Sequence, residues 1–239
     1  METEKNKKPT QEETFQIDMR IVEELTLKIT RKKIIMTRFR FNMEPLQAFY
    51  LLAAHYSVEV KRRHGNPFFD ENTKKNLWAM ASYLTQKDPK FGVMMCGTCG
   101  NGKTTLLYTL QSAINDLHRR DHFAFLGREF RIGLMIVDAK DITEIAKDLD
   151  DLKQYRNHPM LAIDDLGKEP TEVLNFGNVV SPVVDLLEYR YNHQLFTVVT
   201  TNLTPKEIKE KYGARIADRF NEMLEVIRFQ DISYRRLNR

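Results

Sequence analysis

The residues with the clearest chemical potential lie in one short stretch, Cys96–Thr105, which reads CGTCGNGKTT. It contains two cysteines separated by two residues, a spacing found in dithiol redox centres and in metal sites. The same stretch fits the phosphate-binding pattern G-x-x-x-x-G-K-[ST] from Gly97 to Thr104. Two kinds of chemistry therefore compete for one segment, and its surroundings must decide between them.

The surroundings favour phosphate binding over cysteine chemistry. Cys96 and Cys99 are the only cysteines, and no histidine lies near them at the spacing of a structural zinc site. Gly100, Gly102 and Lys103 have no function in dithiol chemistry, but each has one in a phosphate-binding loop. We therefore expect Cys96 to pack as a small apolar residue at a strand end. Cys99 occupies a position where the motif accepts any residue.

The elements around the loop have the required order. The apolar run at 91–96 predicts a buried strand, and 103–114 predicts a helix with apolar residues on one face. The backbone N–H groups between them, with the helix N-terminus, would hold phosphates, while Lys103 reaches the β- and γ-phosphates of ATP and Thr104 ligates Mg²⁺. The predicted nucleotide-binding residues of this Walker A motif are Gly97, Thr98, Cys99, Gly100, Asn101, Gly102, Lys103, Thr104 and Thr105.

A second acidic motif follows about 60 residues later. Residues 160–167, MLAIDDLG, place two aspartates at the end of an apolar strand, as in a Walker B motif. Asp164 is the predicted carboxylate on the Mg²⁺ side, and Asp165 would polarise the attacking water. The alternative is a strand that ends in a solvated acidic turn. The spacing leaves room for an intervening β–α unit, whose strand is predicted at 132–137.

A third predicted strand, at 195–201, runs directly into Asn202. A polar residue at the tip of a strand beside a phosphate site can sense the γ-phosphate or position the water. Further on, Arg215 and Arg219 lie four residues apart and share one helical face. They are either surface ion-pair partners or arginines presented to the nucleotide of a neighbouring subunit.

The ordered set of motifs resembles a known family. The segments GTCGNGKTT, MLAIDDLGKEP, EYRYNHQLFTVVTTNL, YGARIADRF and SYRR are together similar to the AAA+ ATPases of the DnaC/DnaI-type bacterial helicase loaders, and to the related IstB-type transposition helpers, over about residues 75–239. The resemblance implies an α/β P-loop core with a parallel five-stranded sheet flanked by helices. It also implies that Asn202 is sensor 1, Arg219 the arginine finger with Arg215 as a second candidate, and Arg235 the sensor 2 arginine.

Two features depart from the family pattern. Asp165 stands where many AAA+ proteins have glutamate, so we expect slow ATP hydrolysis. Only 37 residues follow Asn202, so the C-terminal lid is expected to be abbreviated and the nucleotide to depend on a neighbouring subunit.

The rest of the chain is divided by composition. Residues 1–14 are polar and predict a disordered tail, 15–70 predict a mainly helical partner-binding region, and 71–239 predict the ATPase domain. The stretch 17–41 has no clear period. Asn42 is the expected cap of a helix at 44–64, whose apolar stripe includes Leu46, Phe49, Tyr50, Ala53 and Tyr56. A second helix at 71–86 carries Leu77, Trp78, Ala81 and Leu84 at helical spacing.

Charge and hydropathy limit the partners. The formal net charge is +4, and its densest basic cluster is Lys28, Arg31, Lys32, Lys33, Arg38 and Arg40. This cluster is either a nucleic-acid contact or a solvated face. Candidates for a single-stranded DNA path, or simply exposed arginines, are Arg119, Arg120, Arg128 and Arg131. No apolar run approaches the ~18 residues of a membrane span, and we expect a cytoplasmic protein without membrane association.

Three functions fit these residues. The first is a helicase-loader ATPase that binds ATP, Mg²⁺ and single-stranded DNA, engages a replicative helicase and self-associates through an arginine finger. The second is a transposition helper with the same ATPase core, and the third is a nucleotide-gated DNA-binding adaptor that does not hydrolyse ATP.

Overall fold

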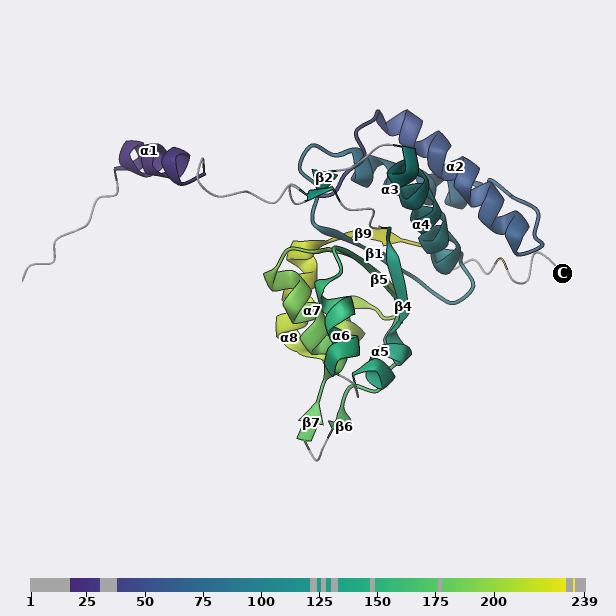
Figure 1. Ribbon diagram of the computed structural model, residues 1–239. Coiled ribbons are helices and arrows are strands. Elements are labelled where there is room, and N and C mark those ends of the chain that lie inside the picture. The colour runs from purple at the N-terminus through teal and green to yellow at the C-terminus, as the bar shows by residue number, and fades with distance from the viewer. Residues whose placement is uncertain are drawn as a thin grey trace, which may run out of the picture. The chain divides into compact units, whose positions relative to one another are not determined.

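The computed structural model describes residues 18–30, 38–120, 124–125, 128–129, 133–146, 149–175, 178–230 and 234 (Figure 1). The chain divides into two compact units, residues 1–37 and 38–239, which are described separately. In the first unit, helix α1 (Met19–Thr30) forms within residues 17–41, the stretch without a clear hydrophobic period.

The second unit is built on a parallel sheet of five strands in the order β4-β5-β8-β1-β9. The strands are β1 (Gly92–Cys96), β4 (Met135–Asp138), β5 (Met160–Leu166), β8 (Phe196–Thr201) and β9 (Leu224–Arg228). The three inner strands β1, β5 and β8 are almost fully buried, as expected for parallel strands covered on both faces, while the edge strands β4 and β9 are only partly buried. The fold therefore brings the carboxyl ends of β1, β5 and β8 to one edge.

Helices cover both faces of this sheet (Figure 1). One face is packed by α2 (Pro45–Arg62), α3 (Glu71–Thr85) and α4 (Lys103–Arg120). The other is packed by α5 (Ala139–Ile145), α6 (Leu149–Asn157), α7 (Pro182–Asn192) and α8 (Pro205–Met223). Two short hairpins complete the described elements: β2 (Ala124–Phe125) with β3 (Arg128–Glu129), and β6 (Val173–Asn175) with β7 (Asn178–Val180). None of the described helices is long and apolar enough to cross a membrane.

Helix α2 corrects two expectations. Its N-cap is Glu44, whose backbone N–H donates to the Gln47 side chain at 3.2 Å, so Asn42 is not the cap. Its buried face is centred on Ala48 and Leu52, while Leu46 is exposed in the predicted stripe, as is Tyr50. The apolar residues of α2 cover more than one face, and the pairing with α3 and α4 selects which of them is buried.

Helix α2 packs into the same core as the sheet. Ala48 and Leu52 belong to the same core cluster as Leu107 and Val198 of the sheet layer. The second compact unit begins at Arg38, inside the region predicted at 15–70. That residues 15–70 bind a partner stays a prediction.

Helix α3 agrees with its predicted range and begins with a clear cap. The Asp70 carboxylate accepts the backbone N–H of Thr73 at 2.7 Å. Leu77, Ala81 and Leu84 are buried. Trp78 is largely exposed and stacks edge-on against Phe49 of α2, with ring centroids 5.8 Å apart.

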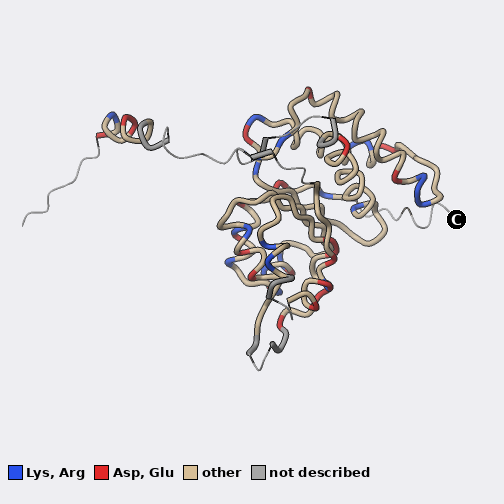
Figure 2. The backbone as a smooth tube through the Cα atoms, viewed as in Figure 1, with Lys and Arg blue, Asp and Glu red and all other residues tan. Residues whose placement is uncertain are grey.

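Charged residues are distributed over both helical layers (Figure 2). Of the predicted basic cluster, Arg38 donates to the Pro89 carbonyl at 2.8 Å and pairs with Asp88 at 3.3 Å, and Arg40 is exposed. The side chains of the remaining cluster members, and those of Arg119, Arg120, Arg128 and Arg131, lie outside the described residues. A nucleic-acid contact at these positions stays a prediction.

Candidate functional site

The loop between β1 and α4 has the conformation that its glycines predict. Gly100 and Gly102 have φ values of 83° and 94°, in the region that side chains disfavour. At Gly97 a Cβ atom would lie 2.7 Å from the Phe229 carbonyl oxygen, so a side chain there would displace the backbone. The loop therefore curls tightly in front of the N-terminus of α4, an arrangement whose backbone N–H groups are suited to binding an anion.

Lys103 lies at the centre of this loop and is only 5% exposed. Its ammonium donates to the carbonyl oxygens of Gly97 and Thr98, both at 2.7 Å, and to Asn101 Oδ1 at 3.0 Å. Burial lowers the pKa of Lys103 below its ordinary value, although nearby acidic groups oppose that shift. The ammonium is thus held by neutral acceptors, which an anionic phosphate oxygen can replace with a stronger bond.

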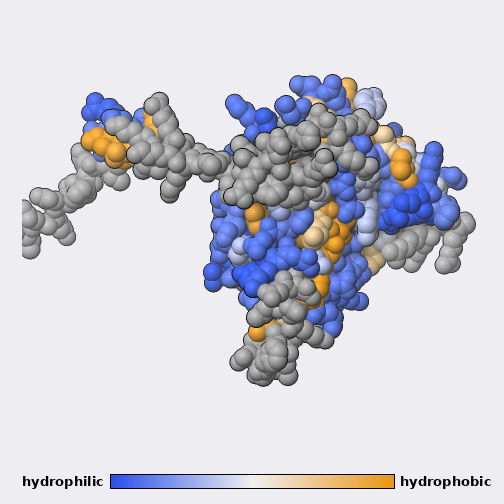
Figure 3. Space-filling view, in the orientation of Figure 1, coloured by the Kyte–Doolittle hydropathy of each residue, from blue (hydrophilic) through white to orange (hydrophobic). Residues whose placement is uncertain are grey.

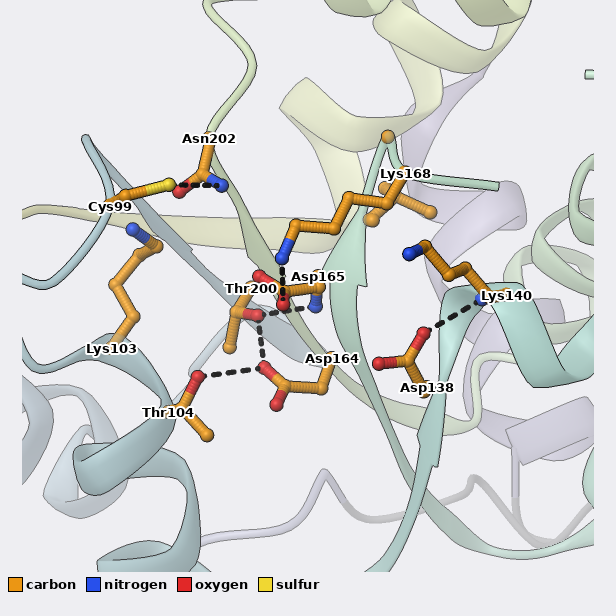
Figure 4. A network of polar contacts seen from close by, with 12 residues as sticks. Cys99, Lys103, Thr104, Asp138, Lys140, Asp164, Asp165, Lys168, Thr200 and Asn202 are labelled. Carbon is orange, nitrogen blue, oxygen red and sulfur yellow. Dashed lines mark hydrogen bonds and ion pairs between the residues drawn. The ribbon is translucent and has the colours of Figure 1, made fainter. Parts of the chain in front are cut away.

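Thr104 and Asp164 meet across the gap between α4 and β5 (Figure 4). The Thr104 hydroxyl donates to Asp164 Oδ1 at 3.4 Å, and the Thr200 hydroxyl donates to the same oxygen at 2.5 Å. Burial raises the pKa of Asp164, and the charge of Asp165 adds to the shift. A hydroxyl and a carboxylate at this separation form the oxygen donor set that Mg²⁺ prefers.

The two aspartates lie at a break in the pairing of β5 with β8. The register shifts between Ile163 and Leu166, and Asp165 has a φ of 57°. This left-handed conformation is tolerated by aspartate more readily than by most residues. The backbone N–H of Asp165 donates to the Thr200 hydroxyl at 2.8 Å, which fixes the irregular turn. Because of this bulge, the consecutive residues Asp164 and Asp165 can both lie at the same edge of the sheet.

Asn202 lies at the tip of β8, where its side-chain N–H₂ donates to the Cys99 sulfur at 3.4 Å (Figure 4). Within the described part of the chain, its buried Oδ1 has no hydrogen-bond partner. The predicted sensor residue therefore faces the phosphate loop. Both cysteines are free thiols, and burial raises the pKa of Cys96, which packs at the end of β1 as expected.

The loop opens into a cavity of about 660 Å³, a size typical of small-molecule sites. Its phosphate end includes Lys103, Asp165, Lys168 and Asn202, and its far end extends between α2 and α3. The wall of the far end is partly apolar and is formed by Tyr56, Val60, Pro67, Phe68, Leu77 and Phe229. A charged end joined to an apolar end matches the two halves of a nucleotide.

Tyr234 connects the two sides of this cavity. Its backbone N–H donates to the Gly100 carbonyl at 3.0 Å, and its hydroxyl contacts both carboxylate oxygens of Asp70 at 2.8 and 3.0 Å. Burial, together with the Asp70 charge, raises the pKa of Tyr234 to about 12, so the hydroxyl donates at neutral pH. The adjacent Arg235, the predicted sensor 2 residue, lies outside the described residues.

The two candidate arginine fingers on α8 differ in exposure. The Arg219 side chain is 13% exposed, lies 2.9 Å from Glu188 and covers the Tyr191 ring at 4.7 Å. The Arg215 side chain is 71% exposed and lies 3.3 Å from the same Glu188 oxygen. Neither lines the cavity as the described residues define it. Both arginines thus form ion pairs, one of the two predicted alternatives, and action on a neighbouring copy stays a prediction.

Sequence reasoning missed two residues that the structure places in the site. Thr200 bonds both aspartates of the acidic motif, and Lys168 forms an ion pair with Asp165. The only available signal was position: Thr200 precedes Asn202 in the TTN tip of the strand, and Lys168 follows the aspartates in DDLGK. Neither position identifies a side-chain contact without the tertiary fold.

Solved structures share this fold, although no protein-family model and no curated protein matches the chain. The DnaC helicase loader aligns with a TM-score of 0.50 and 22% identity, covering 68% of this chain and 92% of the other. DnaI aligns with a TM-score of 0.51 and 22% identity, covering 70% and 86%. At this identity the likeness establishes the fold. The predicted α/β core, a parallel five-stranded sheet flanked by helices with a P-loop after its first strand, is therefore confirmed.

Proposed function

We propose that this chain is an ATPase of the helicase-loader type, which binds ATP with Mg²⁺ and hydrolyses it slowly in an assembly of several copies. The observation that carries the proposal is the meeting of the phosphate loop, the aspartate pair and Asn202 at the carboxyl ends of β1, β5 and β8. Open α/β sheets bind their ligands at this edge.

The chain's own groups account for nucleotide binding. The N–H groups of the loop and the N-terminus of α4 would hold the phosphates, and Lys103 would exchange its carbonyl partners for phosphate oxygens. The apolar far end of the cavity would take the base and sugar.

Thr104 and Asp164 fit a magnesium site, because both present oxygen atoms that already lie 3.4 Å apart. Bound Mg²⁺ supplies positive charge that neutralises the β- and γ-phosphates.

Asp165 would supply the base for hydrolysis. Its carboxylate accepts a proton from a water molecule, the water oxygen bonds to the γ-phosphorus, and the bond from that phosphorus to the bridging oxygen breaks, releasing ADP and phosphate. The Asn202 amide would orient the water. Arg219 of a neighbouring copy, with Arg215 as the second candidate, would stabilise the charge that develops, and Arg235 would contact the γ-phosphate.

The macromolecular partners follow from the same proposal. Single-stranded DNA and a replicative helicase are the expected partners, in the cytoplasm. Support comes from the fold shared with a structure described as a helicase loader, and from the amphipathic α1. Helix α1 exposes Ile21, Leu25 and Leu27. Figure 3 shows apolar residues on this helix beside hydrophilic ones. Exposed apolar side chains of this kind suit a protein partner.

Turnover measurements test the proposal. ATP hydrolysis is measured for the wild type and Asp165→Asn over a range of protein concentrations, with and without single-stranded DNA. Turnover per copy is expected to rise with concentration in the wild type and to be lost in Asp165→Asn. The matched control, Asp141→Asn on the exposed side of α5, should behave as the wild type. A wild type that binds ATP without ever hydrolysing it contradicts the proposal and favours the non-hydrolysing adaptor.

A further inference from the structure

Lys168 lies three residues after Asp165, in the turn that follows β5, and it lines the phosphate end of the cavity. Its ammonium forms an ion pair with Asp165 Oδ2, and Figure 4 shows the side chain pointing back toward that carboxylate. This ion pair raises the pKa of Lys168 above its ordinary value. The residue proposed as the base for hydrolysis is therefore neutralised by a neighbouring lysine.

The backbone that carries Lys168 is fixed on both sides. The Lys168 N–H donates to the Asp165 carbonyl at 3.2 Å, and the Gly167 N–H donates to Glu169 Oε2 at 2.8 Å. Glu169 is buried and accepts the hydroxyl of Tyr212, while the Lys211 ammonium donates to the carbonyls of Gly167 and Glu169 at 3.0 and 2.6 Å. Only the flexible stem of Lys168 is left to move.

The charges around the cavity single out Lys168. Among its lining residues as described, the cationic side chains are Arg63, Lys103 and Lys168. Arg63 is held at the other end by Glu59, 2.7 Å away, and lies over the Tyr108 ring. Lys103 is bonded to acceptors of its own loop. Lys168, with a side chain 43% exposed, is the remaining lining cation that can move to contact an anion bound at the phosphate end.

A terminal phosphate competes with Asp165 for this lysine. The γ-phosphate carries more negative charge than a carboxylate and offers several acceptor oxygens, so charge-assisted bonds favour it. An Asp165 carboxylate that remains paired has one of its two oxygens occupied by the Lys168 ammonium. Moving the ammonium from Asp165 to the phosphate would therefore bind ATP and free the base in the same event.

We propose that Lys168 is a ligand of the terminal phosphate that distinguishes ATP from ADP. Without nucleotide, and with ADP, its ammonium pairs with Asp165. With ATP it contacts the γ-phosphate, and Asp165 is released to act on water. This inference rests on the proposed nucleotide-binding function of the same site.

Binding calorimetry tests the inference with two probes, ADP and the non-hydrolysable ATP analogue AMPPCP, each with Mg²⁺. Lys168→Gln should weaken AMPPCP binding about tenfold and leave ADP binding within about twofold, because one charge-assisted bond is lost only for the analogue. Lys168→Arg should retain the preference for AMPPCP. The matched control is Lys87→Gln, an exposed lysine outside the cavity lining.

The outcomes separate the inference from the function beneath it. If Lys168→Gln weakens both probes equally, or neither, while Lys103→Ala abolishes both, the inference is wrong and nucleotide binding stands. If the wild type binds neither ADP nor AMPPCP, both the inference about Lys168 and the proposed nucleotide binding are wrong. Circular dichroism of Lys168→Gln should match the wild type, because its partly exposed ion pair adds little to stability.

Discussion

The phosphate end of the cavity and helix α8 both present basic side chains, but these side chains are held differently. Lys103 is buried and bonded to three acceptors of its own loop. Arg215 and Arg219 share one glutamate on the adjacent helix and stay outside the cavity lining that the structure describes. We therefore propose that a single copy supplies the groups that bind the nucleotide, and that turnover requires an arginine from a second copy.

The largest effect, on turnover, should come from removing Arg219. Arg219→Ala is expected to lower turnover about 10³-fold, because an arginine finger stabilises charge that develops only in the transition state. ATP affinity, measured by calorimetry at low protein concentration, should stay near that of the wild type. Arg215→Ala is the comparison variant. If it loses more turnover than Arg219→Ala, then Arg215 is the arginine finger.

The second-largest effect should come from removing Lys103, which tests nucleotide binding by the single copy. Lys103→Ala is expected to weaken ATP binding about 100-fold, since two charge-assisted contacts with the phosphates are lost. Fluorescence titration with a labelled nucleotide measures this effect, with Lys87→Ala as the exposed control. Unchanged ATP affinity in Lys103→Ala would show that the loop does not bind the nucleotide.

A smaller effect on ATP affinity should follow from removing the hydrogen bond between Tyr234 and Asp70 across the cavity. Tyr234→Phe removes the hydroxyl that contacts Asp70 and leaves the ring above the loop. Affinity for ATP should fall about fivefold, the loss expected for one hydrogen bond to a charged group at a partly buried site. Tyr50→Phe, on the exposed face of α2, is the matched control. Equal affinities in both variants would show that the link does not support the site.

The smallest effect is a proton taken up on binding at alkaline pH. Because burial lowers the pKa of Lys103, part of the free protein carries a neutral lysine before pH reaches its ordinary value of 10.5. Phosphates bind the charged form, so affinity falls as pH rises through the lowered pKa, and binding must take up a proton. Calorimetry near pH 9 in two buffers of different ionisation enthalpy measures the uptake. Identical heats in the two buffers would contradict it.

The sequence predicted those parts of the site that depend on local order. The strand before Gly97, the helix from Lys103 and the aspartates at the end of β5 are each defined by neighbours in the chain, and the parallel fold brings them to one edge. Thr200 and Lys168 could not be assigned, because their roles depend on a bulge and on a turn held by α8.

Helix α2 shows the same limit in the fold. Its apolar residues do not lie on one stripe, so periodicity alone could not decide whether Leu46 or Leu52 faces the core. The contact with α3 and α4 makes that choice, and it is a tertiary contact. The predicted cap at Asn42 failed for a related reason, because Glu44 and Gln47 close the first turn by their own bond.

Mixing two inactive variants tests most directly whether turnover belongs to a pair of copies. At an ATP concentration that saturates only the wild-type site, Lys103→Ala copies should be almost free of ATP but retain Arg219, while Arg219→Ala copies should bind ATP but lack that arginine. If the arginine acts across copies, the mixture should hydrolyse ATP well above the sum of the two variants measured alone. Turnover equal to that sum at every mixing ratio and protein concentration would contradict the account.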